Sequence, residues 1–368
     1  MVLRGLGGWM AESRPGLSIP MAESETDIAT LKTSDERTSD GIDGEKLLGM
    51  YRQMVLCRTL DERIWLLNRQ GKAAIMASAQ GHEASQIGSV WALRKGQDQF
   101  YIFYRDLAVV LSAGMTPKEI MLGFMAKTGE PMSGARQFPT HGAYPRLGIF
   151  NLSNVVGTQI PQAVGAALAS RMRGEDTVII VYFGDGATSQ GDCHEGMNFA
   201  AIHKLPVIFF CENNRYAISV PLPKQMAVDG VVSRAAGYGM PGVRVDGCDI
   251  VSVYETTAEA AARARAGLGP TLIEAMVERY LPHTTDDDDR RYRTPEEMEE
   301  ARKRDPLKIL KSKLMELGSL TQALDETLHD DAKREVNEAT DFAEAASYPG
   351  TEEFYDHVYS SSGGASSP

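Results

Sequence analysis

The sequence predicts an α/β fold: a mostly parallel sheet with helices on both faces. Two short apolar runs, TVIIVYFGD from Thr177 and LPVIFFCEN from Leu205, are typical of strands buried on both sides. Between them lies a helical segment, HEGMNFAAIHK, after a capping box that we expect from Ser189 and Asp192. Strand, helix and strand make one βαβ unit, whose right-handed crossover makes the two strands parallel.

Length and composition indicate an ordinary soluble protein of one or two domains. The chain has 368 residues, of which 43% are hydrophobic and 24% charged. It contains no apolar run of the ~20 residues that a membrane span requires, and its net charge of -12 disfavours nucleic acid or an anionic membrane as the main partner. Four widely spaced cysteines argue against a zinc site or a disulfide framework, and we expect a cytoplasmic protein; they are Cys57, Cys193, Cys211 and Cys248.

The chain divides into a long domain with two short flanking segments. Residues 1–43 are rich in Ser, Thr, Glu, Asp and Gly without apolar periodicity, which predicts a flexible N-terminal extension. The apolar spacing then predicts a helix over Gly44–Gln70, with Gly71 as its stop. We expect one domain over 44–359 and a disordered tail over 360–368.

The remaining elements continue the α/β alternation. GVRVDG from Gly242 predicts a strand, the segment from Tyr254 a helix, and TLIEAMVERY from Thr271 a third buried strand that leads to His283. Three strand ends could therefore converge on one site. The C-terminal part is helical and charged, and begins with a Thr cap before Pro295.

Polar side chains follow two neighbouring strands of the expected βαβ unit. Asp185 lies just past the carboxyl end of one strand and Asn214 just past the same end of the next, where open parallel sheets bind ligands. A carboxylate, an amide oxygen and backbone carbonyls suit an octahedral Mg²⁺ that also holds phosphates. Either dipeptide alone, Asp185-Gly186 or Asn213-Asn214, would be explained as a turn. Together they favour a metal site.

The spacing of these groups resembles a known signature. G-D-G followed about thirty residues later by N-N is similar to the thiamine diphosphate motif, and GDGATSQGD…FFCENNRYAIS resembles the alpha subunits of 2-oxo acid dehydrogenase decarboxylase components. The resemblance covers roughly Gly44 to Tyr359. It implies the thiamine diphosphate-binding fold with N- and C-terminal helical extensions, and a chain that is catalytic only with a beta subunit, as two alpha and two beta chains.

The resemblance also implies the cofactor site. Mg²⁺ would be held by Asp185, the Asn214 side chain and the Tyr216 carbonyl. In the Y-R-D motif, Arg105 would bind the diphosphate, which His283 would also reach. Without the resemblance, a surface salt bridge and a solvated loop histidine would explain these two. The full implied cofactor set is Phe103, Tyr104, Arg105, Asn154, Val156, Gly184, Asp185, Gly186, Ala187, Asn214, Tyr216, Ala217, Ile218 and His283.

Further roles follow from the same resemblance. The backbones of Asn154 and Val156 would contact the aminopyrimidine, and Ile218 would hold the cofactor bent, although plain core packing also explains Val156 and Ile218. A monovalent cation such as K⁺ would bind at a site whose residues also occur as helix caps; the candidate ligands are Ser153, Thr158 and Gln159.

The substrate class rests on one stretch. GARQFPTHGAYP resembles the R-Q-M-P-x-H segment of branched-chain members, with Phe138 in place of methionine, and His141 would lie near the 2-oxo acid and the lipoyl group of the acyltransferase component. Without the flanking R-Q-x-P-x-H pattern, His141 would be explained as a hydrogen-bonded structural residue. CENNRY is closer to pyruvate-type chains, and a bulky Phe138 would narrow the pocket. The resemblance implies the alpha subunit of a branched-chain 2-oxo acid dehydrogenase, which decarboxylates 2-oxoisovalerate-type acids and acylates the lipoyl group reductively. A pyruvate or acetoin dehydrogenase alpha subunit is the alternative.

Two other function classes compete with these enzymes. One is a non-catalytic scaffold regulated through the HTTDDDD loop, where Thr284 and Thr285 are candidate phosphorylation sites. The other is a Mg²⁺-dependent phosphate hydrolase with Asp185 as nucleophile. The first leaves the intact set of Asp185, Asn214 and Arg105 unexplained, and the second leaves the paired asparagines unexplained.

Overall fold

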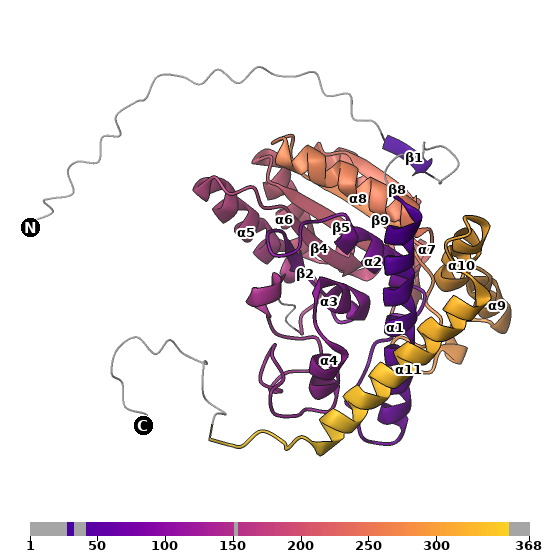
Figure 1. The fold of residues 1–368 in the computed structure, drawn as a ribbon. Helices are drawn as coiled ribbons and strands as arrows, with labels where there is room; N and C mark the ends of the chain where they lie inside the picture. The colour runs from indigo at the N-terminus through magenta and orange to yellow at the C-terminus, as the bar shows by residue number, and fades with distance from the viewer. Residues whose placement is uncertain (1–27, 33–41, 151–153, 353–368) are drawn as a thin grey trace, which may run out of the picture.

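A parallel sheet forms the centre of the fold (Figure 1). The computed structural model describes residues 28–32, 42–150 and 154–352. Across these ranges, seven parallel strands are arranged in the order β1-β8-β9-β5-β4-β2-β3. The strands are β1 (Ile28–Lys32), β2 (Gln99–Tyr101), β3 (Ile149–Phe150), β4 (Ile179–Gly184), β5 (Val207–Asn213), β8 (Gly242–Asp246) and β9 (Thr271–Met276). A separate antiparallel hairpin consists of β6 (Tyr216–Ala217) and β7 (Val220–Pro221).

Helices cover both faces of the sheet, which confirms the predicted fold class. The larger core contains residues from α1, α2, α3, α4, α8, α10 and α11, and the smaller one on the other face is formed with α5 and α6. The helices are α1 (Gly44–Arg69), α2 (Glu83–Trp91), α3 (Leu107–Ala113), α4 (Pro117–Phe124), α5 (Gln159–Arg173), α6 (Gly191–Ile202), α7 (Leu222–Gln225), α8 (Ile250–Arg265), α9 (Pro295–Lys303), α10 (Pro306–Glu316) and α11 (Gln322–Ala345).

The central strands are buried on both sides, as their continuous apolar runs predict. In β4, Ile180 and Tyr182 belong to the larger core, while Val181 and Phe183 belong to the smaller one. This alternation follows from the two-residue period of side chains along a strand. Every residue of β5 is buried. The two strands are therefore fixed between two helical layers, and their carboxyl ends are fixed with them.

Most predicted elements form, with changes at their ends. The N-terminal helix is capped by the Asp43 side chain and ends at Arg69, before Gly71, whose φ is 73°. α8 begins at Ile250, four residues before the predicted start, because Asp249 caps it. β9 stops at Met276. The C-terminal part begins with the predicted Thr cap, but it is split by Pro306 into α9 and α10.

Two expectations need correction or extension. The capping box from Ser189 and Asp192 is wrong: Ser189 ends a 3₁₀ turn, and the N-cap of α6 is Gln190, which makes no side-chain cap bond. Within the expected N-terminal extension, Ile28–Lys32 forms β1 and pairs with β8, which the sequence did not indicate. The other residues of 1–41 and the tail over 360–368 lie outside the described residues.

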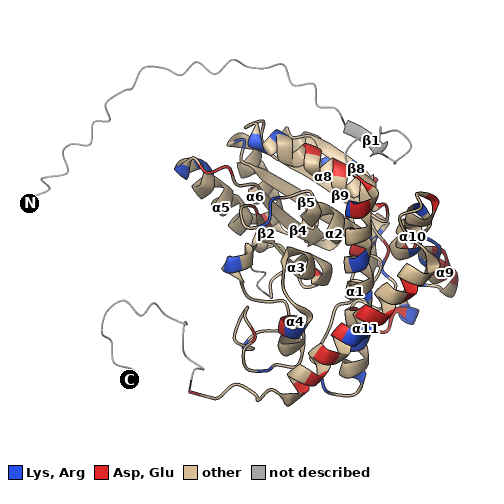
Figure 2. Cartoon of the chain, viewed as in Figure 1, with Lys and Arg blue, Asp and Glu red and all other residues tan. Residues whose placement is uncertain are grey.

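Charge is spread over the helical surface. Figure 2 shows acidic and basic residues intermixed along the ribbon of α11 and around α9 and α10. In the part of the chain that the structure describes, no helix is both long and apolar enough to span a bilayer.

We expect Phe210→Ala to destabilise the chain by about 3–5 kcal/mol, because Phe210 is fully buried in β5 and its ring lies 5.3 Å from that of Tyr182. Phe342→Ala on α11 is the matched control, since this ring is half exposed, and it should cost less than about 1 kcal/mol. Urea denaturation measures both. Equal losses would contradict the assignment of this strand to the core.

Candidate functional site

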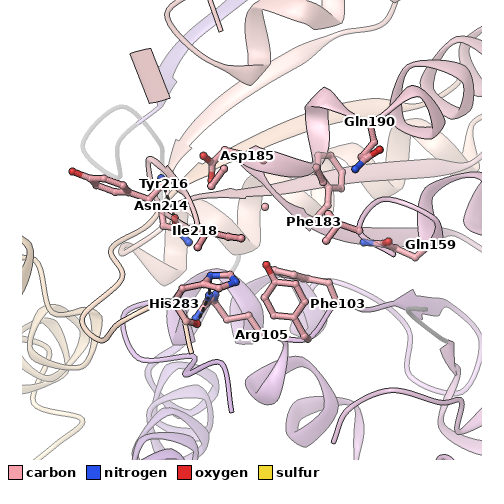
Figure 3. Close-up of a pocket in the computed structure, with 16 residues that line it drawn as sticks. Phe103, Arg105, Gln159, Phe183, Asp185, Gln190, Asn214, Tyr216, Ile218 and His283 are labelled. Carbon is pink, nitrogen blue, oxygen red and sulfur yellow. Dashed lines mark hydrogen bonds between the residues drawn. The ribbon is translucent and has the colours of Figure 1, made fainter. Parts of the chain in front are cut away.

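A pocket lies at the carboxyl edge of the sheet, where β4, β5 and the segment after β9 meet (Figure 3). Its volume is about 260 Å³. All of the predicted cofactor-binding residues except Asn154, which is exposed, line this pocket together with three others, Gln159, Phe183 and Gln190. The lining residues are Phe103, Tyr104, Arg105, Val156, Gln159, Phe183, Gly184, Asp185, Gly186, Ala187, Gln190, Asn214, Tyr216, Ala217, Ile218 and His283.

The pairing register of β4 and β5 brings Asp185 and Asn214, the two candidate metal ligands, to the same edge of the sheet. Gly184 pairs with Glu212, so Asp185 and Asn214 each follow the end of neighbouring parallel strands. Asp185 opens a 3₁₀ turn and is 1% exposed, and Asn214 is 8% exposed. The Oδ1 atom of Asn214 accepts a hydrogen bond from the Tyr216 backbone N–H at 3.2 Å. This turn holds the amide oxygen at the pocket wall.

Asp185 is a buried carboxylate whose charged form a nearby cation would stabilise. Burial raises its pKa to about 6, while a hydrogen bond from the Gln225 side chain, at 2.6 Å, and the more distant Arg279 act in the opposite direction. A divalent ion beside the carboxylate would compensate the burial. Among the described residues, no cluster of three or more His, Cys, Asp and Glu could hold a metal. The donor set here, one carboxylate with amide and backbone oxygens, fits Mg²⁺ and excludes a zinc-type site.

The paired asparagines have different structural roles. Asn213 donates from Nδ2 to Glu274 at 2.6 Å and accepts at Oδ1 from the Arg215 N–H at 2.9 Å. It is fully buried and anchors β5 to β9. Asn214 instead lines the pocket. One member of the pair therefore shapes the turn, and the other faces the candidate metal position.

The β6–β7 hairpin carries backbone strain next to the pocket. Ile218 has a φ of 56°, a left-handed conformation that is costly for a β-branched residue, and its side chain is 56% exposed. The hairpin also packs tightly on the turn after β4, where a Cβ on Gly186 would lie 2.7 Å from that of Ala217. The surrounding structure thus holds an apolar side chain out over the pocket.

The opposite wall carries a buried arginine beside a histidine. Figure 3 shows Arg105 and His283 across the pocket from Asp185. Arg105 is 2% exposed and donates to the Ser78 carbonyl at 2.7 Å and to the His283 carbonyl at 3.1 Å. The surface salt bridge weighed from the sequence is therefore wrong. Buried guanidinium groups of this kind suit phosphate oxygens.

His283 is neutral at physiological pH. Burial lowers its pKa to about 3, helped by the charges of Arg105 and Arg279. Its Nδ1 atom lies 3.2 Å from Nη2 of Arg105, which can only donate, so Nδ1 accepts and Nε2 carries the proton. The Asp287 carboxylate accepts from the backbone N–H of His283 at 2.8 Å. The ring is thus fixed as a hydrogen-bond donor, unlike a solvated loop histidine.

A second, apolar pocket of about 180 Å³ adjoins the first. The two share Tyr104 and His283. His141 is 9% exposed, and its Nδ1 lies 3.0 Å from the Pro139 carbonyl, so Nδ1 is the protonated nitrogen. The lining residues are Ile75, Met76, Ala77, Tyr104, Phe124, Phe138, Pro139, Thr140, His141, His283 and Thr284.

The family is decided by comparison with known proteins. A family model described as "Dehydrogenase E1 component" matches residues 51–352, most of the chain. The chain belongs to the dehydrogenase E1 component family. Thiamine diphosphate is the cofactor on which this family depends. The resemblance inferred from Asp185 and the paired asparagines is therefore confirmed at the level of the family.

Several E1 relatives are similar over most of their length. The 2-oxoisovalerate dehydrogenase subunit alpha of Bacillus subtilis is 50% identical over 319 residues, 87% of this chain and 97% of the relative. The 3-methyl-2-oxobutanoate dehydrogenase subunit alpha of Mycobacterium tuberculosis is 41% identical over 309 residues, 84% of this chain and 81% of the relative. The pyruvate dehydrogenase E1 component subunit alpha of Staphylococcus aureus is 41% identical over 298 residues, 80% of this chain and 77% of the relative.

The candidate monovalent-cation ligands of this E1 chain are only partly brought together. Gln159 is buried and donates to the Tyr182 carbonyl at 2.9 Å, and its Oε1 has no hydrogen-bond partner in the described part of the chain. Thr158 donates to the Val155 carbonyl at 2.9 Å, as in a local turn. Ser153 lies outside the described residues. The K⁺ site remains a prediction.

Sequence reasoning missed most of a buried polar group behind the pocket, of which only Asp106, in the Y-R-D motif, was singled out. His82, Gln86, Asp106 and Glu212 are all fully buried. Burial and the neighbouring Glu212 raise the pKa of Asp106 well above its usual value. Their spacing in the sequence is 4, 20 and 106 residues, so no local pattern could have shown that they meet. The run QGHEASQIG has only the general character of a buried helix.

Replacing the strained Ile218 should reveal its backbone cost. We expect Ile218→Gly to stabilise the chain by about 1 kcal/mol, because relief of about 1–3 kcal/mol of strain exceeds the entropic cost of glycine. Ile218→Ala, which keeps a Cβ, is the control and should change stability less. Urea denaturation measures both. A clear loss of stability in the glycine variant would show that packing, rather than strain, dominates.

Proposed function

We propose that this chain is the alpha subunit of a thiamine diphosphate-dependent 2-oxo acid dehydrogenase that acts on branched-chain acids of the 2-oxoisovalerate type. The observation that carries the proposal is the junction of two pockets at Tyr104 and His283. The first, called the polar pocket below, contains the ionisable side chains of Asp185 and Arg105, and the second is almost wholly apolar. The polar pocket suits a metal diphosphate. The apolar one suits a branched side chain held beside it.

In this proposal the polar pocket holds Mg²⁺ and the diphosphate. The Asp185 carboxylate, the Asn214 amide oxygen and the Tyr216 carbonyl would bind the ion, and Arg105 would bind phosphate oxygens as a fork of donors. The Nε2–H of His283 would donate to the same anion. Thiamine diphosphate, when bound, supplies the electron sink for loss of CO₂ from the 2-oxo acid.

The residues around the two pockets would orient the reactants. Ile218, held in a strained conformation, would support the cofactor in its bent form, and the backbones of Asn154 and Val156 would contact its pyrimidine. His141, with the proton on Nδ1, keeps the Nε2 lone pair as a hydrogen-bond acceptor near the substrate and the lipoyl group. A fixed tautomer of this kind favours one direction of hydrogen bonding.

A beta subunit would complete the site. Large apolar side chains at and near the pocket are exposed: Val155 is 60% exposed, Val156 37%, Ile218 56% and Val220 42%. Exposed apolar groups beside a binding site are typical of a protein interface. The relatives are named as alpha subunits. These facts support a beta partner. In the proposal, as the family resemblance implies, two alpha and two beta chains assemble and transfer the acyl group to a lipoylated acyltransferase. The four buried, free cysteines support a cytoplasmic location.

The alternatives differ in what they leave unexplained. A pyruvate or acetoin dehydrogenase alpha subunit keeps the same fold and cofactor, and would need the bulk of Phe138 to limit the apolar pocket. A scaffold does not require the buried and costly Asp185. A phosphate hydrolase does not require the apolar pocket or the strained Ile218.

Substrate comparison tests the proposal directly. With the chain co-expressed with a beta subunit from its own genome, we expect kcat/KM for CO₂ release to be about tenfold or more higher for 2-oxoisovalerate than for pyruvate, because each added methyl group gains apolar contact. Mg²⁺ and thiamine diphosphate should be required. A preference for pyruvate would support the pyruvate-type alternative, and no release from either acid would support the scaffold.

Asp185→Asn tests the metal site. At pH 7.5, above the pKa of about 6, the wild-type carboxylate is ionised and bears the cost of burial. We therefore expect the variant without cofactor to melt at the same or a higher temperature than the wild type. We also expect it to lose the rise in melting temperature on addition of Mg²⁺ and thiamine diphosphate.

The control for this variant is Asp192→Asn, in the first turn of α6 and outside the pocket lining. It should keep the rise in melting temperature. A wild-type rise in Asp185→Asn would refute the assignment of this residue as a metal ligand.

A further inference from the structure

His82 lies at the centre of a buried relay that ends at the pocket. It is the N-cap of α2 and is fully buried. Its Nδ1 atom lies 2.5 Å from Oε2 of Glu212, and its Nε2 atom lies 3.5 Å from Nδ2 of Asn214. Asn214 in turn lines the polar pocket. The relay therefore runs from a buried carboxylate, through an imidazole, to a pocket side chain.

The direction of each hydrogen bond follows from the backbone. The Tyr216 N–H can only donate, so the atom of Asn214 that faces it is the oxygen. The amide nitrogen then faces His82, and Nε2 must accept. The Glu212 carboxylate can only accept, so Nδ1 of His82 independently carries a proton that points at it. Every contact in the relay is thus a donor facing an acceptor, and the opposite orientation of the amide would place two donors face to face.

A neighbouring residue fixes the far end of the relay. Gln86 donates from Nε2 to the same Glu212 oxygen at 3.0 Å, and its Oε1 accepts from the Ala108 N–H at 3.0 Å. Gln86 is therefore also held in one orientation. A helix, a strand end and a second helix together determine the tautomer of His82.

We propose that His82 is a positioning residue that selects the orientation of the Asn214 carboxamide, with the oxygen held at the metal position. The inference rests on the proposed function. A carboxamide offers oxygen and nitrogen in nearly the same shape, but only the oxygen can bind Mg²⁺. An sp² oxygen has two lone pairs, so Oδ1 can accept from the Tyr216 N–H and bind a metal at the same time.

The test measures cofactor binding by calorimetry on the alpha chain co-purified with its beta subunit. The readout is the Mg²⁺ concentration that gives half-maximal binding of thiamine diphosphate. We expect His82→Phe, which keeps a ring but removes both nitrogens, to raise this concentration by about 10–100-fold, the usual effect of losing a residue behind a metal ligand. For His82→Gln this Mg²⁺ concentration should stay within about threefold of wild type. The glutamine carboxamide, like the imidazole, offers one hydrogen-bond donor and one acceptor on either side of a single carbon.

A control variant separates positioning from general stability. Ser89 is equally buried on α2, but its hydroxyl bonds only to the Gln86 backbone carbonyl and the Tyr182 hydroxyl, and to none of the relay side chains. Ser89→Ala should lower the melting temperature and leave the Mg²⁺ requirement unchanged. If His82→Phe gives no folded complex, His82→Met takes its place in the same comparison with His82→Gln.

The outcomes are distinct. An unchanged Mg²⁺ requirement in the apolar variant, or an equal loss in the apolar and glutamine variants, would overturn the role of His82 while the proposed function stands. A wild-type complex that binds no thiamine diphosphate at any Mg²⁺ concentration would overturn the proposed function itself.

Discussion

The parallel pairing of β4 with β5 is the constraint on which the site depends. Because Gly184 lies opposite Glu212, the residues that follow each strand reach the same edge of the sheet. A shift of one residue would turn every side chain of a strand to the opposite face and separate Asp185 from Asn214. The register is set by burial on both faces, since β4 and β5 contribute to both cores. Core packing therefore also sets the relative position of Asp185 and Asn214.

The pocket separates opposite charges across a short distance. Asp185 faces it from one side, and Arg105 and the neutral His283 from the other (Figure 3). All three are largely shielded from water, so their interactions with an anion or a cation are stronger than at a surface. The burial that raises the pKa of Asp185 and lowers that of His283 has one cause, the loss of hydration of the charged form. A metal diphosphate would bring a cation to the side of Asp185 and an anion to the side of Arg105.

One error of sequence analysis and one rejected alternative share a physical origin. Ser189 and Asp192 match a capping box locally, yet the 3₁₀ turn that opens with Asp185 extends to Ser189 and moves the start of α6 by one residue. Arg105 resembles a surface residue because arginine is usually exposed, whereas here it is buried against the Ser78 and His283 carbonyls. In both cases tertiary contacts override a local preference.

The sequence alone determined the fold class, the position of Asp185 and Asn214 at neighbouring strand ends, and the family, because strand periodicity and motif spacing are local properties of the chain. Only the tertiary structure decided which polar residues meet behind them. His82 and Glu212 are 130 residues apart and become neighbours through the packing of α2 against the end of β5. It also decided the tautomers of His82, His141 and His283, since a tautomer depends on which donors and acceptors surround the ring. Those surroundings exist only after long-range packing has brought distant segments together.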